Sequence, residues 1–187
     1  PVTPQDFDYL RQLLRQRSGL VLSAEKQYLA ESRLLPVARK HGLADLAELV
    51  GRLKAAANAP LGTDVVEAMT TNESFFFRDK VPFDHLRETM IPALLQARAG
   101  RHSLRIWCAA GSTGQEPYSI AMCLKEFGAA LAGWRIEIIA TDLSNEALET
   151  ARAGLYSQFE VQRGLPIQLL VKYLKQFGEH RQLNADI

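Results

Sequence analysis

Two acidic residues, Glu116 and Asp142, each follow an apolar run of the sequence. Glu116 lies in a turn of small residues, 111–119 (GSTGQEPYS), that comes after the apolar run 104–110. Asp142 comes directly after a second run, 135–141. The backbone amides of such a turn can face a ligand, and an acid at the tip of the next parallel strand can accept hydrogen bonds from two ribose hydroxyls. The sequence therefore predicts a nucleoside-binding site at the carboxyl edge of a parallel sheet.

The charge of Glu116 narrows the kind of ligand. A carboxylate at a helix N-terminus repels a pyrophosphate group but attracts an ammonium group. We therefore expect a ligand with an amino group rather than a dinucleotide, although a favourable charge at a helix start explains Glu116 as well. Asp142 can alternatively cap the next helix, but Ser144 is available for that role, so the ligand role is favoured.

The segment 70–79 (TTNESFFFRD) has three consecutive aromatic residues and no clean helical or strand period. Asn72 and Ser74 offer hydrogen-bond donors and acceptors to a polar ligand, and Arg78 can bind a carboxylate. The alternative is a hinge between domains with a hydrophobic plug. Composition alone favours the hinge.

The first seventy residues carry apolar side chains at helical spacing, with cap and stop signals between them. Ser23 is expected to cap a helix that Pro36 breaks or kinks and that Gly42 stops. Four helices are expected to begin near Pro4, Ser23, Leu43 and Leu61, with Asn58-Ala59-Pro60 separating the last two. This part of the sequence predicts a helical bundle.

The rest of the sequence alternates strand-like and helical stretches, which is typical of an α/β fold with a doubly wound parallel sheet. Strands are expected at 104–110 and 135–141, with a third beginning near Gln182. Helices are expected at 80–99 (interrupted by Pro92), after Pro117, after Ser144 and at 167–177. Two strands would leave an apolar edge exposed, so we expect this sequence to be the front portion of a larger domain.

Composition and motifs argue against several classes of protein. The net charge of +1 gives no reason to expect nucleic-acid binding, although residues 1–54 carry nine Lys or Arg against six Asp or Glu. That excess suits an acidic partner or a solvated surface equally well. No run is long enough to span a membrane and no signal peptide is visible, so a cytoplasmic protein is expected. The four histidines are scattered without a metal motif, and Cys108 and Cys123 are predicted to be buried thiols.

Three stretches together resemble the CheR-type chemotaxis receptor methyltransferases: TTNESFFFRD at 70–79, WCAAGSTGQEPYSIAM at 107–122 and ATDLSNEALETARAGLYSQFEVQRGLP at 140–166. That family uses S-adenosylmethionine to methylate glutamate side chains on the cytoplasmic helices of chemoreceptors, in chemotaxis signalling adaptation. The resemblance runs from about residue 4 to the end. Gly111 stands where the family commonly has Cys. The family's later strands and small β insertion are expected to be absent, so the chain resembles a C-terminally truncated member.

The resemblance implies a helical receptor-recognition domain at 1–75, a linker and connecting helix at 76–100, and the front part of a methyltransferase domain at 101–187. It also implies S-adenosylmethionine as cofactor, S-adenosylhomocysteine as product, and the cytoplasmic helices of chemoreceptors as partners. The residues it places at the cofactor are Asn72, Ser74, Arg78, Gly111, Glu116 and Asp142, with Glu116 near the amino-acid end and Asp142 at the ribose.

A receptor glutamate is already ionised at neutral pH, so methyl transfer to it needs no general base and no catalytic acid–base residue is expected. Two other functions stay open. One is a module of the same fold that binds cofactor or a regulatory partner without turnover. The other is a nicotinamide-dependent oxidoreductase, which Glu116 and the lack of a complete G-x-G-x-x-G motif disfavour.

Overall fold

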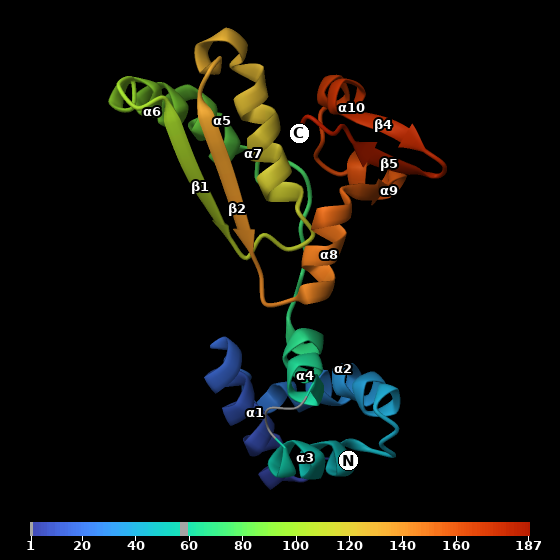
Figure 1. Cartoon of the computed structure of the whole chain (residues 1–187). Helices are drawn as coiled ribbons and strands as arrows, with labels where there is room; N and C mark the ends of the chain where they lie inside the picture. The colour runs from blue at the N-terminus through green and yellow to red at the C-terminus, as the bar shows by residue number, and fades with distance from the viewer. Residues whose placement is uncertain (1, 57–59) are drawn as a thin grey trace. The chain divides into compact units, whose positions relative to one another are not determined.

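The computed structural model describes residues 2–56 and 60–187, and the chain divides into two compact units, Pro1–Thr71 and Asn72–Ile187. The first unit is helical and the second combines helices with two small sheets (Figure 1). The predicted order, a helical bundle followed by a parallel α/β sheet, is confirmed. Among the residues described, no helix is long and apolar enough to cross a bilayer.

The first unit packs its helices around one aliphatic core. Its elements are α1 Pro4–Ser18, η1 Ala24–Lys26, α2 Gln27–Lys40, α3 Leu46–Ala55 and α4 Pro60–Met69. Leu10 of α1, Leu34 of α2 and Leu49 of α3 are fully buried in this core. Because apolar residues recur at helical spacing in each helix, one face of every helix is turned into the core.

Three predicted helix boundaries in this unit are wrong. The Ser23 hydroxyl makes no capping bond and is buried without a partner, and α2 begins only at Gln27. α2 then continues through Pro36 to Lys40, so Pro36 does not break the helix, and the other expectation, a kink, stays a prediction. The third helix starts at Leu46 rather than Leu43, because Asp45 accepts a hydrogen bond from the Glu48 amide (2.9 Å) and caps it.

Other boundaries match the prediction. Gly42 follows the end of α2 with φ +70°, a left-handed conformation that glycine adopts without strain. The predicted turn Asn58-Ala59-Pro60 lies outside the described residues except for Pro60, the first residue of α4.

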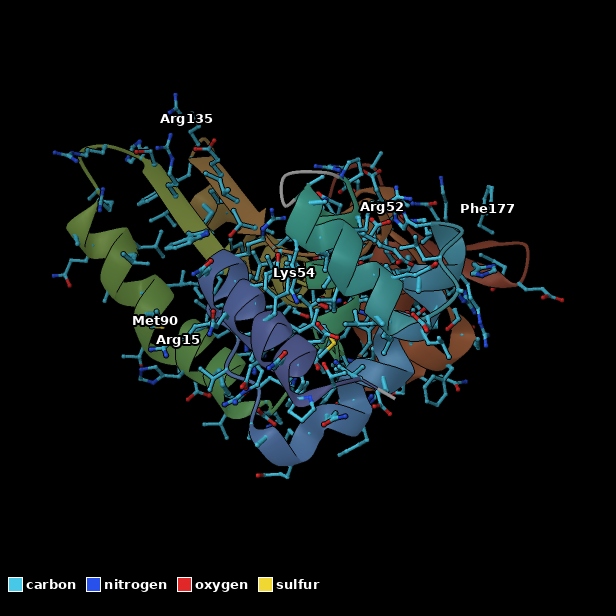
Figure 2. All side chains as sticks on the ribbon, turned by 90° about the horizontal axis from the view of Figure 1, so that it is seen from below. Arg15, Arg52, Lys54, Met90, Arg135 and Phe177 are labelled. Atoms are coloured by element: carbon cyan, nitrogen blue, oxygen red, sulfur yellow. The ribbon has the colours of Figure 1, made fainter. Side chains whose placement is uncertain are left out.

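The second unit is built on a parallel pair of strands. Its elements are α5 Val81–His85, the π-helical turn η2 Leu86–Met90, α6 Ile91–Ala97, β1 Ser103–Ala109, α7 Gln115–Glu126, η3 Gly128–Leu131, β2 Arg135–Thr141, α8 Asn145–Ala153, β3 Leu155–Ser157, α9 Gln158–Gln162, α10 Ile167–Tyr173, β4 Leu174–Phe177 and β5 His180–Leu183. β1 and β2 pair in parallel from Ser103↔Arg135 to Ala109↔Thr141, with α7 in the connection between them. Arg135, at the start of β2, projects away from the ribbon (Figure 2).

The two faces of this sheet differ. On one face, the buried Leu104 and Cys108 belong to the same core as Ile91 of α6 and Leu124 of α7. On the other face, Trp107 is 69% exposed and Ile139 is 40% exposed. Helices α6 and α7 lie beside the pair (Figure 1). The sheet is therefore covered by helices of this chain on one side.

The predicted buried thiols are confirmed. Cys108 of β1 and Cys123 of α7 are free cysteines and both are buried. Burial raises the pKa of each thiol to about 11, because the charged thiolate is poorly solvated there.

A second, antiparallel sheet near the C-terminus was not predicted. Its strand order is β3-β5-β4. The expected helix at 167–177 ends at Tyr173, and Leu174–Phe177 is a strand that pairs with β5. The strand near Gln182 exists, but it belongs to this sheet and not to the parallel one. The chain thus contains a small β unit, and the expectation that it lacks one is wrong.

The predicted helical stretch 80–99 is present as α5, η2 and α6 in succession. Pro92 lies in the first turn of α6, where its missing N–H is tolerated. At the far end of the unit, Phe177 of β4 is 60% exposed and its side chain points outward (Figure 2).

Candidate functional site

The turn between β1 and α7 is drawn tightly against β2. The Gly111 amide donates to the Thr141 carbonyl (2.9 Å), which extends the parallel pairing by one step. A Cβ added at Gly111 would come 2.8 Å from the Cβ of Ala140, closer than side chains normally approach. Ser112 and Gly114 both have positive φ (50° and 98°), so the chain reverses sharply before α7 begins. The result is a turn whose backbone lies close to the tip of the second strand.

Asp142 holds this turn in place from the end of β2. Its Oδ2 accepts a hydrogen bond from the Ser112 amide (2.8 Å), and its Oδ1 accepts one from the Ser144 amide (2.9 Å). The cap of α8 is Ser144, whose hydroxyl accepts from the Ala147 amide (3.0 Å). Each carboxylate oxygen can accept a further hydrogen bond, so the turn contacts leave Asp142 able to bind hydroxyl groups.

A cavity of about 260 Å³ opens between this turn and the aromatic segment. Its lining residues come from two stretches of the chain: Glu73, Ser74, Phe75, Arg78, Asp79, Pro82 and Phe83 from one, and Ala110, Ser112 and Glu116 from the other. The stretch 73–83 and the stretch 110–116 are therefore its two walls. Ligand cavities in proteins usually measure about 300–1,000 Å³. This one fits an end of a ligand rather than a whole nucleoside derivative.

The structure brings three of the six predicted residues together at the cavity, namely Ser74, Arg78 and Glu116. The other three, Asn72, Gly111 and Asp142, do not line it. They adjoin it through Ser112, whose hydroxyl donates to the Asn72 carbonyl (3.0 Å) and whose amide donates to Asp142. Ser112 thus connects the lining of the cavity to Asn72 and Asp142.

Arg78 is an exposed residue of the first wall. Its guanidinium donates to the Glu73 carbonyl (3.1 Å) and lies 5.7 Å from the ring centre of Phe75. These contacts engage a small part of its five N–H donors. The remaining donors are free to form a forked pair with a carboxylate.

The first wall is held from behind by residues that the sequence analysis did not single out. The Arg163 guanidinium lies 4.3 Å from the ring centre of Phe75 and donates to Glu73 Oε1 (3.0 Å). Gly164 packs so close to the same segment that an added Cβ would fall 2.0 Å from the Phe76 carbonyl oxygen. The stretch RGLP belongs to a motif of the resemblance, but its spacing gave no sign of this contact.

A second link joins the first wall to α7. The Phe77 amide donates to the hydroxyl of Ser119 (3.1 Å), and that hydroxyl donates to the Gln115 carbonyl (2.6 Å). Ser119 is fully buried inside α7. It is therefore a structural hydroxyl and not an exposed nucleophile.

The electrostatics of the cavity favour a positively charged group. Its lining includes three carboxylates, on Glu73, Asp79 and Glu116, and one cation, on Arg78. Glu116 stands in the first turn of α7 and is exposed. Across residues 2–56 and 60–187, no cluster of three or more His, Cys, Asp or Glu residues could hold a metal ion. The arrangement can bind a ligand that carries both an ammonium and a carboxylate.

Comparisons with known proteins find family models for both parts of the chain. The family model described as "CheR methyltransferase, SAM binding domain" matches residues 72–187, and the model "CheR methyltransferase, all-alpha domain" matches residues 5–70. The first match indicates S-adenosylmethionine as the cofactor of the second unit.

Curated relatives match along almost the whole chain. Chemotaxis protein methyltransferase 1 of Pseudomonas aeruginosa is 42% identical over 181 residues, covering 94% of this chain and 65% of the relative. Chemotaxis protein methyltransferase Cher2 of Pseudomonas putida is 40% identical, with 94% and 65% covered. The chemotaxis protein methyltransferase of Vibrio parahaemolyticus is 37% identical, with 99% and 67% covered. The chain therefore spans about 65% of the length of the first two relatives.

Proposed function

The chain belongs to the CheR methyltransferase family, and on this premise we propose that it takes part in methylating glutamate side chains of chemoreceptors with S-adenosylmethionine. The observation that carries the proposal is the cavity that Glu116 and Arg78 line together, next to a strand tip that ends in Asp142. Such a site has a partner for three polar parts of the cofactor: its ammonium, its carboxylate and its ribose.

We assign the six predicted residues by their chemistry. Glu116 binds the ammonium of the cofactor, and Arg78 binds its carboxylate. Asp142 accepts the ribose hydroxyls with the lone pairs that the turn leaves free. Of the remaining three, Ser74 contributes a short polar group to the lining of the cavity, and Asn72 and Gly111 contribute backbone or short polar groups next to it. This assignment places the amino-acid end of the cofactor in the 260 Å³ cavity and the nucleoside toward β2.

The cofactor supplies a methyl group bonded to a positively charged sulfur. Held by Glu116, Arg78 and Asp142, the cofactor would give this methyl group to a receptor carboxylate, the sulfur would keep the bonding electrons, and the products would be a methyl ester and S-adenosylhomocysteine. The charges of the two reactants cancel, so no proton has to move. The protein's own residues then act by holding the methyl group in line with the carboxylate and by excluding water.

We further propose the division of labour that the sequence suggests. The helical part, expected at residues 1–75, would recognise the receptor with its helices, while its last residues, 72–75, belong to the second unit, and 73–75 belong to the wall of the cavity. Residues 76–100 would connect, and residues 101–187 would form the front part of the methyltransferase domain. The excess of basic over acidic residues in 1–54 supports an acidic receptor surface as the partner. Action on the cytoplasmic helices of a receptor requires a cytoplasmic protein.

Calorimetry with S-adenosylhomocysteine tests the site assignment. Asp142→Ala and Arg78→Ala should each weaken binding about tenfold or more, because each removes charged hydrogen bonds to the ligand. Matched controls are Asp186→Ala and Arg152→Ala, which remove the same charges from exposed ion pairs of the same unit. Unchanged affinity in both site variants would reject the assignment.

A truncated ligand separates the two ends of the site. Methylthioadenosine keeps the nucleoside but lacks the amino-acid end. Arg78→Ala and Glu116→Gln should therefore leave its affinity unchanged while weakening S-adenosylhomocysteine, and Asp142→Ala should weaken both ligands. Equal losses for both ligands in Glu116→Gln would contradict the assignment of that residue to the ammonium.

The alternative is a module that binds cofactor without turnover. Transfer of a labelled methyl group from S-adenosylmethionine to receptor cytoplasmic fragments separates it from the enzyme. Base-labile label on the receptor supports the enzyme, because methyl esters hydrolyse in base. Tight cofactor binding with no label transferred by the 187-residue chain supports the binding module.

A further inference from the structure

Tyr156 of β3 is a fully buried phenol that the proposed chemistry does not use. Its hydroxyl donates a hydrogen bond to the Thr113 carbonyl at 2.7 Å. The edge of its ring packs against Phe76, with ring centres 5.1 Å apart and an interplanar angle of 78°. A buried tyrosine hydroxyl needs a partner, and here that partner is the backbone of the turn between β1 and α7.

These two contacts reach both walls of the cavity. Thr113 lies between Ser112 and Glu116, which line the second wall, and Phe76 lies between Phe75 and Arg78, which line the first. One side chain therefore touches the backbone of one wall and the aromatic segment of the other.

The turn is shaped to admit this phenol. A Cβ at Gly114 would come 2.8 Å from the Tyr156 hydroxyl oxygen, so the backbone passes over the hydroxyl at a distance that only glycine allows. Burial also raises the pKa of Tyr156 well above its usual value, so the hydroxyl keeps its proton and stays a donor.

We infer that Tyr156 is a positioning residue that fixes the two walls of the cavity relative to each other, so that Glu116 and Arg78 can grip one ligand together. The ligand part of this inference rests on the proposed function. Tyr156 also pairs with Arg181 of β5, so the small antiparallel sheet is tied to the turn through the same residue. A change in that sheet would then reach the cofactor site through one hydrogen bond.

The chain offers a matched control for removing this hydroxyl. Tyr118 of α7 also donates its hydroxyl to a backbone carbonyl, that of Ala151 in α8, at 2.6 Å. Tyr156→Phe and Tyr118→Phe therefore remove the same group and the same kind of bond from the same unit. Only the first bond reaches the turn that lines the cavity.

Two measurements on the full 187-residue chain test the inference. In calorimetry, Tyr156→Phe should weaken S-adenosylhomocysteine binding about fivefold to tenfold, the effect of one lost hydrogen bond, and Tyr118→Phe should change it less than twofold. In hydrogen exchange, Tyr156→Phe should speed exchange of amides in 75–78 and 111–116 and leave β1 and β2 unchanged. A merely structural role would speed exchange throughout the unit.

The outcomes distinguish this inference from the proposed function. If the unaltered chain does not bind S-adenosylhomocysteine, the proposed function fails, while the exchange experiment still decides the role of Tyr156. If the unaltered chain binds and both variants bind equally well, or if exchange in the two walls is unchanged by Tyr156→Phe, the inference is overturned.

Discussion

Different kinds of contact stabilise the interior of the helical unit and the interior of the α/β unit. The first has a core of aliphatic side chains such as Leu10, Leu34 and Leu49, which meet because their spacing along each helix matches its period. In the second, polar side chains are also buried. Among the described residues, the four buried polar ones all lie in this unit: Ser112, Gln115, Ser119 and Ser144. The first kind of packing tolerates small adjustments of the backbone. The second depends on where individual backbone atoms lie.

The glycines show the same difference. A Cβ at Gly19, Gly42 or Gly51 of the helical unit would meet nothing within 4 Å. In the α/β unit, a Cβ at Gly114 or Gly164 would collide with a side chain or the backbone. Gly19 and Gly42 therefore follow the ends of helices in the first unit, and Gly114 and Gly164 permit close approach in the second.

The largest expected effect is that of Gly164→Ala. Its Cβ would sit 2.0 Å from the Phe76 carbonyl oxygen, at a φ of +84° that alanine rarely adopts. The free energy of unfolding of the α/β unit should fall by more than about 4 kcal/mol. Both tryptophans, Trp107 and Trp134, lie in this unit, so urea denaturation followed by tryptophan fluorescence measures it.

The control for that variant is Gly178→Ala. Gly178 also has positive φ (+58°), but nothing lies within 4 Å of an added Cβ. Gly178→Ala should lower the free energy of unfolding by about 1–2 kcal/mol, which is the strain of the left-handed conformation alone. Equal losses at the two positions would show that the close approach at Gly164 does not matter.

The next effect in size is that of Leu10→Ala in the helical unit. Leu10 is fully buried, and truncation of such a leucine lowers the free energy of unfolding by about 2–5 kcal/mol. In urea denaturation, far-UV circular dichroism should show loss of helix at a lower urea concentration than in the unaltered chain. The transition seen by tryptophan fluorescence should stay at the urea concentration of the unaltered chain. Val21→Ala, at a side chain 79% exposed, is the control and should change stability by less than about 0.5 kcal/mol. A matching shift in fluorescence after Leu10→Ala would mean that the two units unfold together.

The smallest expected effect is on the stability of the helical unit at acidic pH. In the helical unit, a hydrogen bond from His41 and then one from Lys40 hold the pKa of Asp64 below its usual value. A carboxyl whose pKa is lower in the folded state stabilises the fold above its unfolded pKa, and this contribution is lost as the pH falls through the folded pKa. Asp64→Asn should therefore lower stability at neutral pH by less than about 1 kcal/mol, and this effect should disappear as the pH falls through the folded pKa of Asp64.

Helical circular dichroism as a function of pH checks this expectation. The difference between Asp64→Asn and the unaltered chain should shrink as the pH falls through the acid range. Asp8→Asn is the control, since that carboxylate is 63% exposed beside Arg11. A difference that grows toward low pH would contradict the assigned direction.

The sequence predicts structure well where contacts are local. The run that becomes β1, the small-residue turn and α7 follow from composition and spacing, as does the cap of α8 at Ser144. It misleads where a distant partner decides. Leu170, Tyr173, Leu174 and Phe177 have helical spacing, yet the chain turns extended at Leu174 because that stretch pairs with β5. No local signal distinguishes the two structures.

The candidate site shows the same limit. Glu116 stands out as a carboxylate in a turn of small residues, whereas the family resemblance, and not composition, placed Ser74 and Arg78 at the cofactor. All three line one cavity in the structure. Arg163 and Tyr156 were missed as supports of that cavity, because their partners Glu73 and Thr113 lie 90 and 43 positions away. Their chemistry becomes visible only when the chain is folded.

The two buried cysteines can report how often the α/β unit opens. Cys108 and Cys123 are its only cysteines, both lie in the α/β unit, and their thiolates are scarce at neutral pH. An alkylating reagent can therefore modify them only when that unit opens. Mass spectrometry counts zero, one or two added groups, so the rate of labelling measures how often the cofactor-binding unit opens. No engineered probe is needed. A bound ligand should slow the labelling.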